Sequence, residues 1–389
     1  MILNVFIIKF IPYTEIDWET YMKHISIYKK GIYNYTKLEG PTGPCVYPAG
    51  FVYIYSTMYS ITNKGKNLKM AQYIFSMIYI FNLMLVLNIY RKSKRVPIYF
   101  LILISITSYR VHSIYVLRMF NDTLSILLLH IGLNFLLYQR YTLSSIFLSL
   151  ALSVKMNILL YFPAYGIILV LSKGIEYGIL QAFLMLFIQV ILGLSFLLES
   201  APAYLNRAFQ LGRQFDYKWT VNWRFVSPVL FSSRGFHVAL LALHLTFLTY
   251  FICGVWIRKC NLSIWSMLYR RVSSIKMDAN DIMSCMFISN FLGVMFARSL
   301  HYQFYVWYYY SIPFLLWTAY PPGHPFYKLF GRTNFKLLIW GLIEYCWNVY
   351  PSTVVSSLTL NACHCVILIG LLYPLLNLKK EKTKIAKLN

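Results

Sequence analysis

Long apolar stretches separated by short polar segments run along the whole chain. Many of them approach the ~20 residues that an α-helix needs to cross a bilayer. The pattern predicts spans at approximately 1–12, 70–90, 97–111, 123–139, 142–154, 157–172, 178–198, 236–257, 282–298, 303–320, 333–350 and 353–376. Of these, 1–12 and 142–154 are short for full spans. The chain is therefore predicted to be an all-α polytopic membrane protein, with residues 1–389 forming one integral-membrane domain.

Composition supports this class. Hydrophobic residues make up 59% of the chain and charged residues 12%, and the mean hydropathy is +0.57. Soluble domains have roughly twice that charged share. The seven cysteines show no metal or disulfide spacing, and Cys363-His364-Cys365 lies in an apolar run that favours plain packing.

The net charge of +24 is gathered in short clusters between apolar runs, which does not indicate nucleic-acid binding. Lys/Arg clusters of this kind mark cytoplasmic loops. The clusters are Arg91–Arg95, Arg258–Lys259, Arg270–Arg271 and Lys379–Lys380. If the chain starts in the cytosol, strict alternation of the spans puts 91–96, 258–281 and the basic tail 377–389 in the cytosol. The side predicted by alternation therefore agrees with the side predicted by the basic clusters.

The same alternation puts a second set of segments on the opposite side, taken as the lumen of the endoplasmic reticulum (ER). They are 13–69, 112–122, 155–157, 199–235 and 299–302. Residues 46–62 are apolar and rich in tyrosine, but counting them as a span would move Arg91–Arg95 to the wrong side. We interpret them as a re-entrant or interfacial helix within a first lumenal loop, 13–69, because tyrosine suits the membrane interface. Residues 199–235 form a large lumenal loop.

Three of the twelve acidic residues, Glu15, Asp17 and Glu19, lie together just after the first apolar segment. A carboxylate cluster at a membrane boundary suits proton abstraction, cation binding or pairing with basic residues. On a helix Glu15 and Glu19 would share a face without Asp17, whereas an extended segment would put all three on one face. The ring of Trp18, next to Asp17, would suit stacking on a sugar.

Several functional classes are excluded or weakened. The chain has no P-loop, no Rossmann glycine pattern and no zinc-ligand pair at helical spacing, which removes ATP-driven transporters. A secondary transporter or lipid-linked-sugar flippase stays open as the alternative. Transporters place charged residues near the bilayer midplane, often in repeated halves. Here no internal repeat stands out, and of the acidic residues only Glu344 lies clearly within a span. Residues 1–11 also lack the features of a cleavable signal peptide.

Longer motifs lie in the lumenal segments and at the span ends beside them. They are Tyr13–Trp18 (YTEIDW), Thr42–Phe51 (TGPCVYPAGF), Ser108–Ser113 (SYRVHS), Leu117–Asp122 (LRMFND), Leu152–Asn157 (LSVKMN), Leu211–Phe215 (LGRQF), Trp219–Phe225 (WTVNWRF) and Ser299–Trp307 (SLHYQFYVW). In order, from about Tyr13 to about Leu372, the chain closely resembles the ER dolichyl-phosphate-mannose-dependent α-1,3-mannosyltransferases.

The resemblance implies a GT-C-type helical bundle whose lumenal loops form the active site. It implies a dolichyl-phosphate mannose donor, a dolichyl-pyrophosphate five-mannose acceptor, an ER membrane location among its lipids, and inversion at the sugar without a cofactor. Asp17 matches the position of the presumed base. The chain departs from the family in the short segment before Tyr13, in Pro41 where an acid is usual, and in 262–281, which shows no useful match.

Binding residues follow from the same motifs. The leaving phosphate needs positive charge, and Arg298 and His301 lie three apart at a lumenal span end, where a helix would put both on one side. Lys155 and Arg213 are the next candidates for the phosphate. The remaining candidates for substrate contact are Glu15, Trp219, Asn222 and Arg224. For each basic residue, pairing with a lumenal acid is the structural alternative. No carboxylate pair has convincing metal spacing, and a single donor phosphate does not require a metal.

Overall fold

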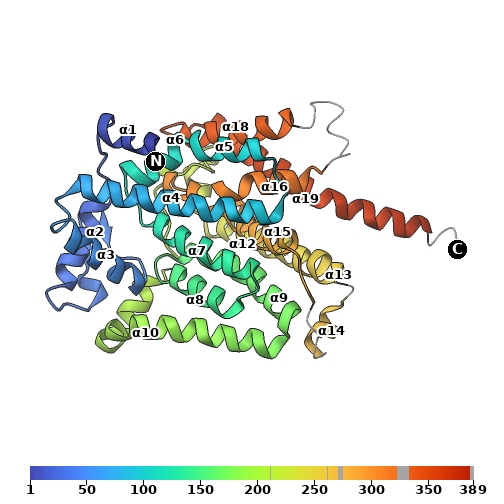
Figure 1. Ribbon diagram of the computed structural model, residues 1–389, viewed down its shortest axis with the longest axis horizontal. Coiled ribbons are helices and arrows are strands. Elements are labelled where there is room, and N and C mark those ends of the chain that lie inside the picture. The colour runs from blue at the N-terminus through green and yellow to red at the C-terminus, as the bar shows by residue number, and fades with distance from the viewer. Residues whose placement is uncertain (211, 261, 270–274, 322–332, 386–389) are drawn as a thin grey trace. The chain divides into compact units, whose positions relative to one another are not determined.

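Figure 1 shows the computed structural model, in which residues 1–210, 212–260, 262–269, 275–321 and 333–385 are described. Within them, regular structure is helical except for one two-stranded antiparallel ribbon. The predicted all-α class is confirmed. The chain divides into two compact units. The first unit comprises Met1–Lys92, Ile102–Phe162 and Glu176–Arg213, and the second comprises Ser93–Leu101, Pro163–Ile175 and Gln214–Asn389.

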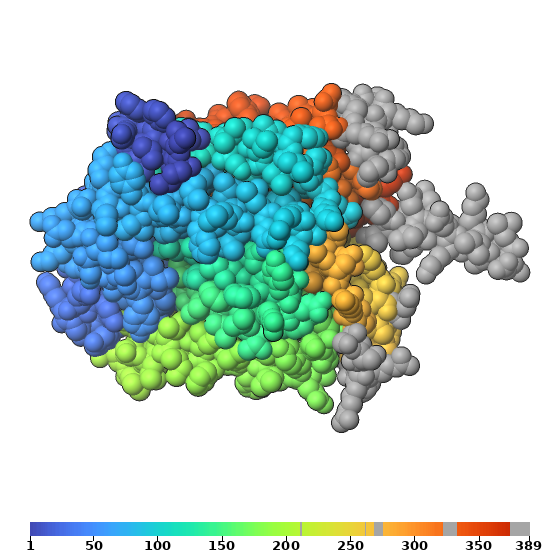
Figure 2. Space-filling model, viewed as in Figure 1, coloured from blue at the N-terminus to red at the C-terminus, as the bar shows by residue number. Residues whose placement is uncertain are grey.

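The first unit begins with short elements. They are α1 (Ile2–Phe10), α2 (Trp18–Tyr28), the 3-10 turn η1 (Tyr35–Lys37), β1 (Glu39–Gly40), β2 (Gly43–Pro44) and α3 (Ala49–Ile61). At 1.5 Å per residue the nine residues of α1 extend only about 14 Å, less than half of the ~30 Å hydrocarbon core. The expected span at 1–12 is therefore a short helix. It lies against α4 (Leu68–Ser93), as Figure 2 shows by colour. The Asn4 amide donates to Ser76 Oγ of α4 at 3.0 Å.

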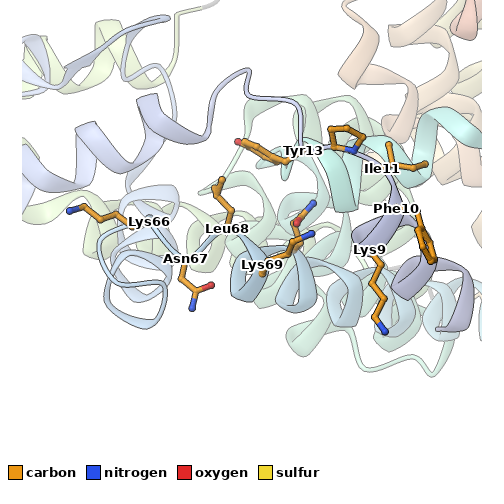
Figure 3. Close-up of a pocket in the computed structure, with 10 residues that line it drawn as sticks. Lys9, Phe10, Ile11, Tyr13, Lys66, Asn67, Leu68 and Lys69 are labelled. Atoms are coloured by element: carbon orange, nitrogen blue, oxygen red, sulfur yellow. The ribbon is translucent and has the colours of Figure 1, made fainter.

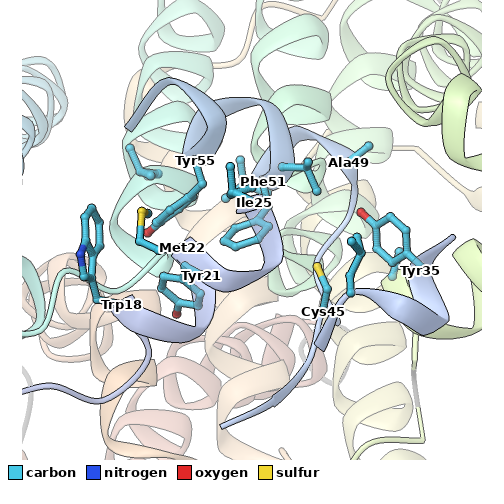
Figure 4. Packing of buried hydrophobic residues seen from close by; sticks show 14 of the residues in the cluster. Trp18, Tyr21, Met22, Ile25, Tyr35, Cys45, Ala49, Phe51 and Tyr55 are labelled. Carbon is cyan, nitrogen blue, oxygen red and sulfur yellow. The ribbon is translucent and has the colours of Figure 1, made fainter. Parts of the chain in front are cut away.

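An aromatic cluster joins α2 to α3 (Figure 4). The Tyr21 ring lies edge-on to Phe51 and Tyr55, with centroid distances of 5.2 and 4.9 Å. Trp18 packs edge-on to Phe75 and donates its indole N–H to Gly65 O at 3.0 Å. Buried aromatic pairs of this kind each stabilise a fold by about 0.5–1.5 kcal/mol beyond their area burial. The cluster holds the two helices together. The 13 residues of α3 extend about 20 Å, and their re-entrant or interfacial position stays a prediction.

The middle of the first unit is a run of packed helices. They are α4, α5 (Ile98–Ile106, which belongs to this unit from Ile102 on), α6 (Tyr109–His112), the π-helical turn η2 (Ser113–Leu117), α7 (Asp122–Leu137), α8 (Tyr141–Leu152) and the 3-10 segment η3 (Met156–Tyr161). Helices α7 and α8 run side by side (Figure 1). A Cβ at Gly132 of α7 would lie 3.3 Å from Ser144 O of α8, so a residue without a side chain permits this close approach.

Helix α10 (Ile175–Ala208) continues ten residues past the predicted span 178–198. Its backbone breaks at Ser200, which has a non-helical φ of −165° and ψ of 96°, two residues before Pro202. The second half returns toward the first, so that the Tyr204 ring stacks on Phe196 at 5.7 Å. The first part of the predicted loop 199–235 is therefore helical. The Tyr204 hydroxyl accepts the Ala49 N–H at 3.2 Å, which satisfies a donor at the start of α3.

The second unit contains the remaining elements. They are α9 (Phe162–Lys173), η4 (Tyr217–Trp219), α11 (Pro228–Phe231), α12 (Arg234–Phe251), the π-helical turn η5 (Ile252–Trp256), α13 (Ile257–Lys259), α14 (Ile264–Tyr269), α15 (Ala279–Met295), η6 (Tyr302–Trp307), η7 (Tyr309–Ser311), α16 (Ile312–Ala319), α18 (Asn334–Asn348) and α19 (Val354–Ile385). Its core is largely aromatic. The Trp347 indole donates to the Tyr308 hydroxyl at 2.8 Å, and the Tyr308 hydroxyl also hydrogen-bonds His364 Nε2 at 2.8 Å.

Five helices among the described residues are long and apolar enough to cross a membrane. They are Leu68–Ser93, Met156–Lys173, Ile175–Ala208, Arg234–Lys259 and Val354–Tyr373. A sixth is obtained if Ile98–Ile106 and Tyr109–Leu117, bent by 50°, form one span. The predicted continuous helix at 303–320 is wrong, because that segment is two 3-10 turns followed by the eight-residue α16. The predicted basic cluster Arg270–Arg271 lies outside the described residues.

Gly50, in the first turn of α3, provides a test of this packing. A Cβ there would lie 2.8 Å from Ser153 Cβ and 2.9 Å from Ser153 O, so the turn before η3 would have to move. We expect Gly50→Ala to lower the free energy of unfolding by about 1–3 kcal/mol, the usual cost of overpacking. Thermal unfolding of the purified protein in detergent measures the change.

Gly166→Ala in α9 is the matched control, because no atom lies within 4 Å of its Cβ and alanine favours a helix. It should be neutral or slightly stabilising. Equal melting temperatures for Gly50→Ala and Gly166→Ala would contradict the close approach of α3 to Ser153.

Candidate functional site

Asp17 occupies the N-cap position of α2, but its side chain does not cap the helix. The Glu19 backbone N–H donates instead to Glu15 Oε1 at 3.1 Å. Glu15 thus satisfies an unpaired donor of the first turn, and it also accepts a hydrogen bond from the Tyr13 hydroxyl. The predicted binding residue Glu15 is placed as the cap of α2. The Asp17 carboxylate is left to make other contacts.

Both oxygens of the Asp17 carboxylate accept hydrogen bonds from hydroxyl groups. Oδ1 accepts from Thr42 Oγ1 at 3.0 Å, and Oδ2 accepts from the Tyr21 hydroxyl at 3.3 Å. Burial raises the pKa of Asp17 above its usual value, while the Thr42 hydrogen bond and the Lys155 charge partly oppose that rise. A carboxyl group with a raised pKa is a stronger base than an ordinary one and suits proton abstraction.

Trp18, which the sequence suggested as a sugar-stacking residue, is placed differently. Its side chain is only 1% exposed, because it packs in the aromatic cluster of α2 and α3. The expectation that its ring stacks on a sugar is therefore wrong. Trp18 instead anchors the start of α2 beside Asp17.

Lys155 is buried in an ion pair with Asp122, at a distance of 2.5 Å between Nζ and Oδ2. The same ammonium group donates to Asn121 Oδ1 at 3.1 Å and lies 5.5 Å from the centroid of the Tyr47 ring. Burial lowers the pKa of Lys155, and the charges of Asp122 and Asp17 counter that effect. Removing one partner of such a pair leaves an uncompensated buried charge, at a cost of about 3–5 kcal/mol.

Arg213 belongs to the same electrostatic environment. It is exposed at the end of the first unit, and its charge adds to the lowering of the Lys155 pKa, which burial dominates. It also opposes the burial-driven rise of the Tyr47 pKa. Of the nine candidate residues, the structure therefore groups Asp17, Lys155 and Arg213 in one environment, with Glu15 on the adjoining turn.

The other five candidates lie in the second unit. Asn222 is buried, and its amide bridges two chain segments. Its Oδ1 accepts the Leu300 N–H and its Nδ2 donates to Ala297 O, both at 2.9 Å. The Trp223 indole also donates to Ala297 O, at 2.8 Å. The Asn222 amide thus ties the loop after η4 to the segment between α15 and η6.

The contacts of Asn222 with Ala297 and Leu300 lie in the segment that contains Arg298 and His301. The expectation that a helix puts both on one side is wrong, because α15 ends at Met295 and His301 immediately precedes η6. The Leu300 carbonyl accepts the Val221 N–H at 2.8 Å, so backbone groups here bond to the neighbouring loop instead of to a helix. The His301 ring stacks on Phe215, with centroids 5.1 Å apart. Arg298 is half-buried.

Trp219 and Arg224 flank the same loop. Trp219 stacks with Tyr350 at 6.2 Å between centroids, and the Lys218 ammonium lies 4.8 Å from its ring centroid. The Arg224 guanidinium lies 4.5 Å from the Tyr217 ring centroid and donates to Tyr217 O at 3.1 Å. Both candidates therefore contribute to the packing of the loop.

Sequence reasoning missed four residues that contact Asp17 or Lys155. They are Tyr21, Thr42, Asn121 and Asp122. Asp122 and Lys155 are separated by 33 residues, so their pairing depends on how α7 and α8 fold together. A signal was present, because an acid at the start of one apolar run and a lysine at the end of the next both require a partner.

Two grooves among the described residues are lined by residues other than the candidates. The larger, of about 500 Å³, lies between the end of α1 and the start of α4 and is lined by residues that include Lys9, Lys66 and Lys69 (Figure 3). The smaller lies beside Glu19 and Glu39. In the described part of the chain, no group of three His, Cys, Asp or Glu residues is arranged to hold a metal ion.

Comparison with known proteins supplies the family. A model described as "ALG3 protein" matches residues 1–357. A human protein named "Dol-P-Man:Man(5)GlcNAc(2)-PP-Dol alpha-1,3-mannosyltransferase" is 46% identical over 373 residues, which cover 95% of this chain and 83% of the human protein. An Arabidopsis thaliana protein of the same name is 41% identical over 386 residues, with 95% and 85% covered.

A Dictyostelium discoideum protein, named as a probable enzyme of this type, is 40% identical over 429 residues and covers 98% of this chain and 93% of its own length. No solved structure gives a significant match. Since the family model matches residues 1–357 and these relatives are 40–46% identical over nearly the whole chain, the protein belongs to the ALG3 protein family.

Proposed function

We propose that this protein transfers mannose from dolichyl-phosphate mannose, in α-1,3 linkage, to the dolichyl-pyrophosphate-linked five-mannose oligosaccharide of N-glycan assembly. Relatives of this name, 40–46% identical, support the assignment. The observation that carries the chemistry is the half-buried Asp17 carboxylate, held by two hydroxyl groups and made more basic by burial. No observation favours the alternative of a transporter or flippase.

The reaction assigns a role to Asp17. The donor is a β-linked mannosyl phosphate, so one displacement with inversion gives the α-linkage. The acceptor hydroxyl attacks the anomeric carbon, the bond to the phosphate oxygen breaks, and the hydroxyl proton passes to Asp17. Dolichyl phosphate leaves with the bonding electron pair. The purified protein should therefore release one dolichyl phosphate for each mannose transferred, whereas a transporter would move its ligand without cleaving it.

The location follows from the same proposal. The protein is a multi-pass ER membrane protein, and both substrates are taken from the lumenal leaflet, so the loop that carries Asp17 faces the lumen. The donor phosphate is assigned to Arg298 and His301, with Arg213 as the next candidate. Lys155, which forms an ion pair with Asp122, is a next candidate together with Arg213.

The first test concerns the base. Asp17→Asn keeps the size of the side chain and removes its basicity, so we expect turnover to fall about 100-fold or more, as for loss of a general base. The measurement is mannose transfer from dolichyl-phosphate mannose to acceptors of defined mannose count, with linkage analysis of the product. Glu19→Gln, an exposed neighbour, is the control and should stay within about twofold of wild type. A well-folded Asp17→Asn protein with normal turnover would exclude this base.

The second test concerns the donor phosphate. Charge-assisted hydrogen bonds to a leaving phosphate strengthen as its negative charge grows, so Arg298→Ala should lower kcat/KM for the donor about 10- to 100-fold. His301→Ala should act in the same direction more weakly, and the KM for the acceptor should change little in both. Steady-state kinetics with each substrate varied in turn separate these effects. If Arg298→Ala uses the donor normally while Arg213→Ala does not, the phosphate site moves to Arg213.

The third test concerns orientation. Lys66, in the turn before α4, and Lys276, before α15, are both exposed and are assigned to the lumen and the cytosol, respectively. In sealed microsomes a membrane-impermeant thiol reagent should label Lys276→Cys directly and Lys66→Cys only after the membrane is permeabilised. Wild-type protein, with its seven native cysteines, sets the background. The opposite labelling pattern would overturn the topology and the non-spanning assignment of 46–62.

A further inference from the structure

Two side chains connect the Asp17 carboxylate to the buried Lys155–Asp122 pair. The Tyr21 hydroxyl lies 3.3 Å from Asp17 Oδ2 and also 3.3 Å from Asn121 Oδ1. Asn121 Oδ1 in turn accepts from Lys155 Nζ at 3.1 Å. The chain of contacts therefore runs from Asp17 through Tyr21 and Asn121 to Lys155, and ends on Asp122.

The amide of Asn121 is oriented by Lys155. An ammonium group only donates hydrogen bonds, so it selects the amide oxygen and repels the amide nitrogen. With Oδ1 held toward Lys155, the same oxygen is the group that faces the Tyr21 hydroxyl. Asn121 is fully buried, which limits any other arrangement of the amide. The ion pair thus determines that Tyr21 meets an acceptor on the side away from Asp17.

We propose that Tyr21, Asn121, Lys155 and Asp122 form a buried network that positions Asp17, in which the Tyr21 hydroxyl changes its hydrogen-bond acceptor as Asp17 takes up the substrate proton. This inference rests on the proposed role of Asp17 as the base. None of the four residues contacts the reacting atoms in this proposal, so each is a positioning residue.

The single proton of the Tyr21 hydroxyl is the reason for the change of acceptor. A hydroxyl can donate to one acceptor at a time, and here two acceptors lie at equal distances. When Asp17 is ionised, Tyr21 donates to it. When Asp17 has accepted the proton from the attacking hydroxyl, its new O–H donates to the Tyr21 oxygen, and the Tyr21 proton turns to Asn121 Oδ1. Both protonation states of the base are then hydrogen-bonded without movement of heavy atoms.

The ion pair also sets the charge felt by Asp17. The ionisable groups that act on it are Tyr13 before α2, Tyr21 in α2, Tyr47 before α3, Tyr55 in α3, Asp122 at the start of α7 and Lys155 before η3. Burial raises the pKa of the four tyrosines, so their side chains stay neutral over the pH range of an activity assay. The charged members are Lys155, which lowers the pKa of Asp17, and Asp122, which raises it.

Lys155 and Asp122 shift the pKa of Asp17 in opposite directions. Variants of the two residues should therefore have opposite effects, which loss of structure alone would not produce. The probe is the acidic limb of the pH profile of kcat/KM, measured with dolichyl-phosphate mannose and the five-mannose acceptor, because this limb follows the ionisation of the free base. Lys155→Met should move the limb to higher pH by at least about half a unit, and Asp122→Asn should move it to lower pH. Lys155→Arg keeps the charge and should restore the wild-type limb. The double variant Lys155→Met with Asp122→Asn should also lie near wild type, because the two shifts cancel.

Tyr21→Phe tests the hydroxyl itself. The variant keeps the aromatic ring in the cluster and should lower kcat about tenfold with little change in either KM, since a hydrogen bond to a charged group is lost. Tyr53→Phe is the control, because its hydroxyl donates to Leu192 O at 2.8 Å and lies outside the network. Its kcat should match wild type.

The outcomes separate the two proposals. If the limb moves in the same direction in Lys155→Met and Asp122→Asn, or moves in neither, or if Tyr21→Phe retains full kcat, the network proposal is wrong. If Asp17→Asn itself remains active, the base is wrong and the network has no role. Thermal unfolding identifies any single variant that has lost its fold. In that case the double variant and Tyr21→Phe decide the question.

Discussion

An ammonium group and a carboxylate lose their hydration when they are buried together, and the loss is recovered only if their hydrogen bonds are well made. The Lys155–Asp122 pair meets this condition, with a short contact between the two charges and the Asn121 oxygen as a second acceptor. It joins the start of α7 to the turn after α8. The positions of Asn121, Tyr21 and finally Asp17 depend on this pair.

The aromatic cluster between α2 and α3 supports the same group of residues from the other side. Tyr21 belongs to both, since its ring packs on Phe51 and Tyr55 while its hydroxyl faces Asp17. Gly50 lets α3 approach Ser153, two residues before Lys155, and the Phe51 N–H donates to Ser153 O at 3.1 Å. Packing and polar contacts therefore restrain Asp17 together, which suits its proposed role of removing a proton at a defined position.

Charge has two different uses in this chain. The basic clusters between spans are predicted to lie in the cytosol, because basic residues are more frequent in cytoplasmic loops. Three of the basic residues assigned to the opposite side contact an acidic or aromatic side chain. Lys155 pairs with Asp122, Arg207 lies 3.7 Å from Glu39, and Arg224 lies on the Tyr217 ring. Pairing, the structural alternative considered for each basic residue, thus accounts for part of this set.

The sequence by itself determined the class and the family. Apolar runs of nearly membrane-spanning length and a low charged share need no tertiary information to indicate a helical membrane protein. The motifs around Asp17, Lys155, Asn222 and His301 were sufficient to indicate mannosyl transfer. Span boundaries were less well predicted, because the break at Ser200 and the 3-10 turns after His301 depend on contacts with distant segments.

Only the tertiary structure decided the contacts of the candidate residues. Asp122 and Lys155 are 33 residues apart, and Tyr21 and Asn121 are 100 residues apart, so no local pattern pairs them. Trp18 was suggested as a sugar contact and is buried, because burial depends on what packs against a ring and not on its neighbours in sequence. Sequence periodicity reports the face of a helix, whereas hydrogen-bond partners are set by how separate helices meet.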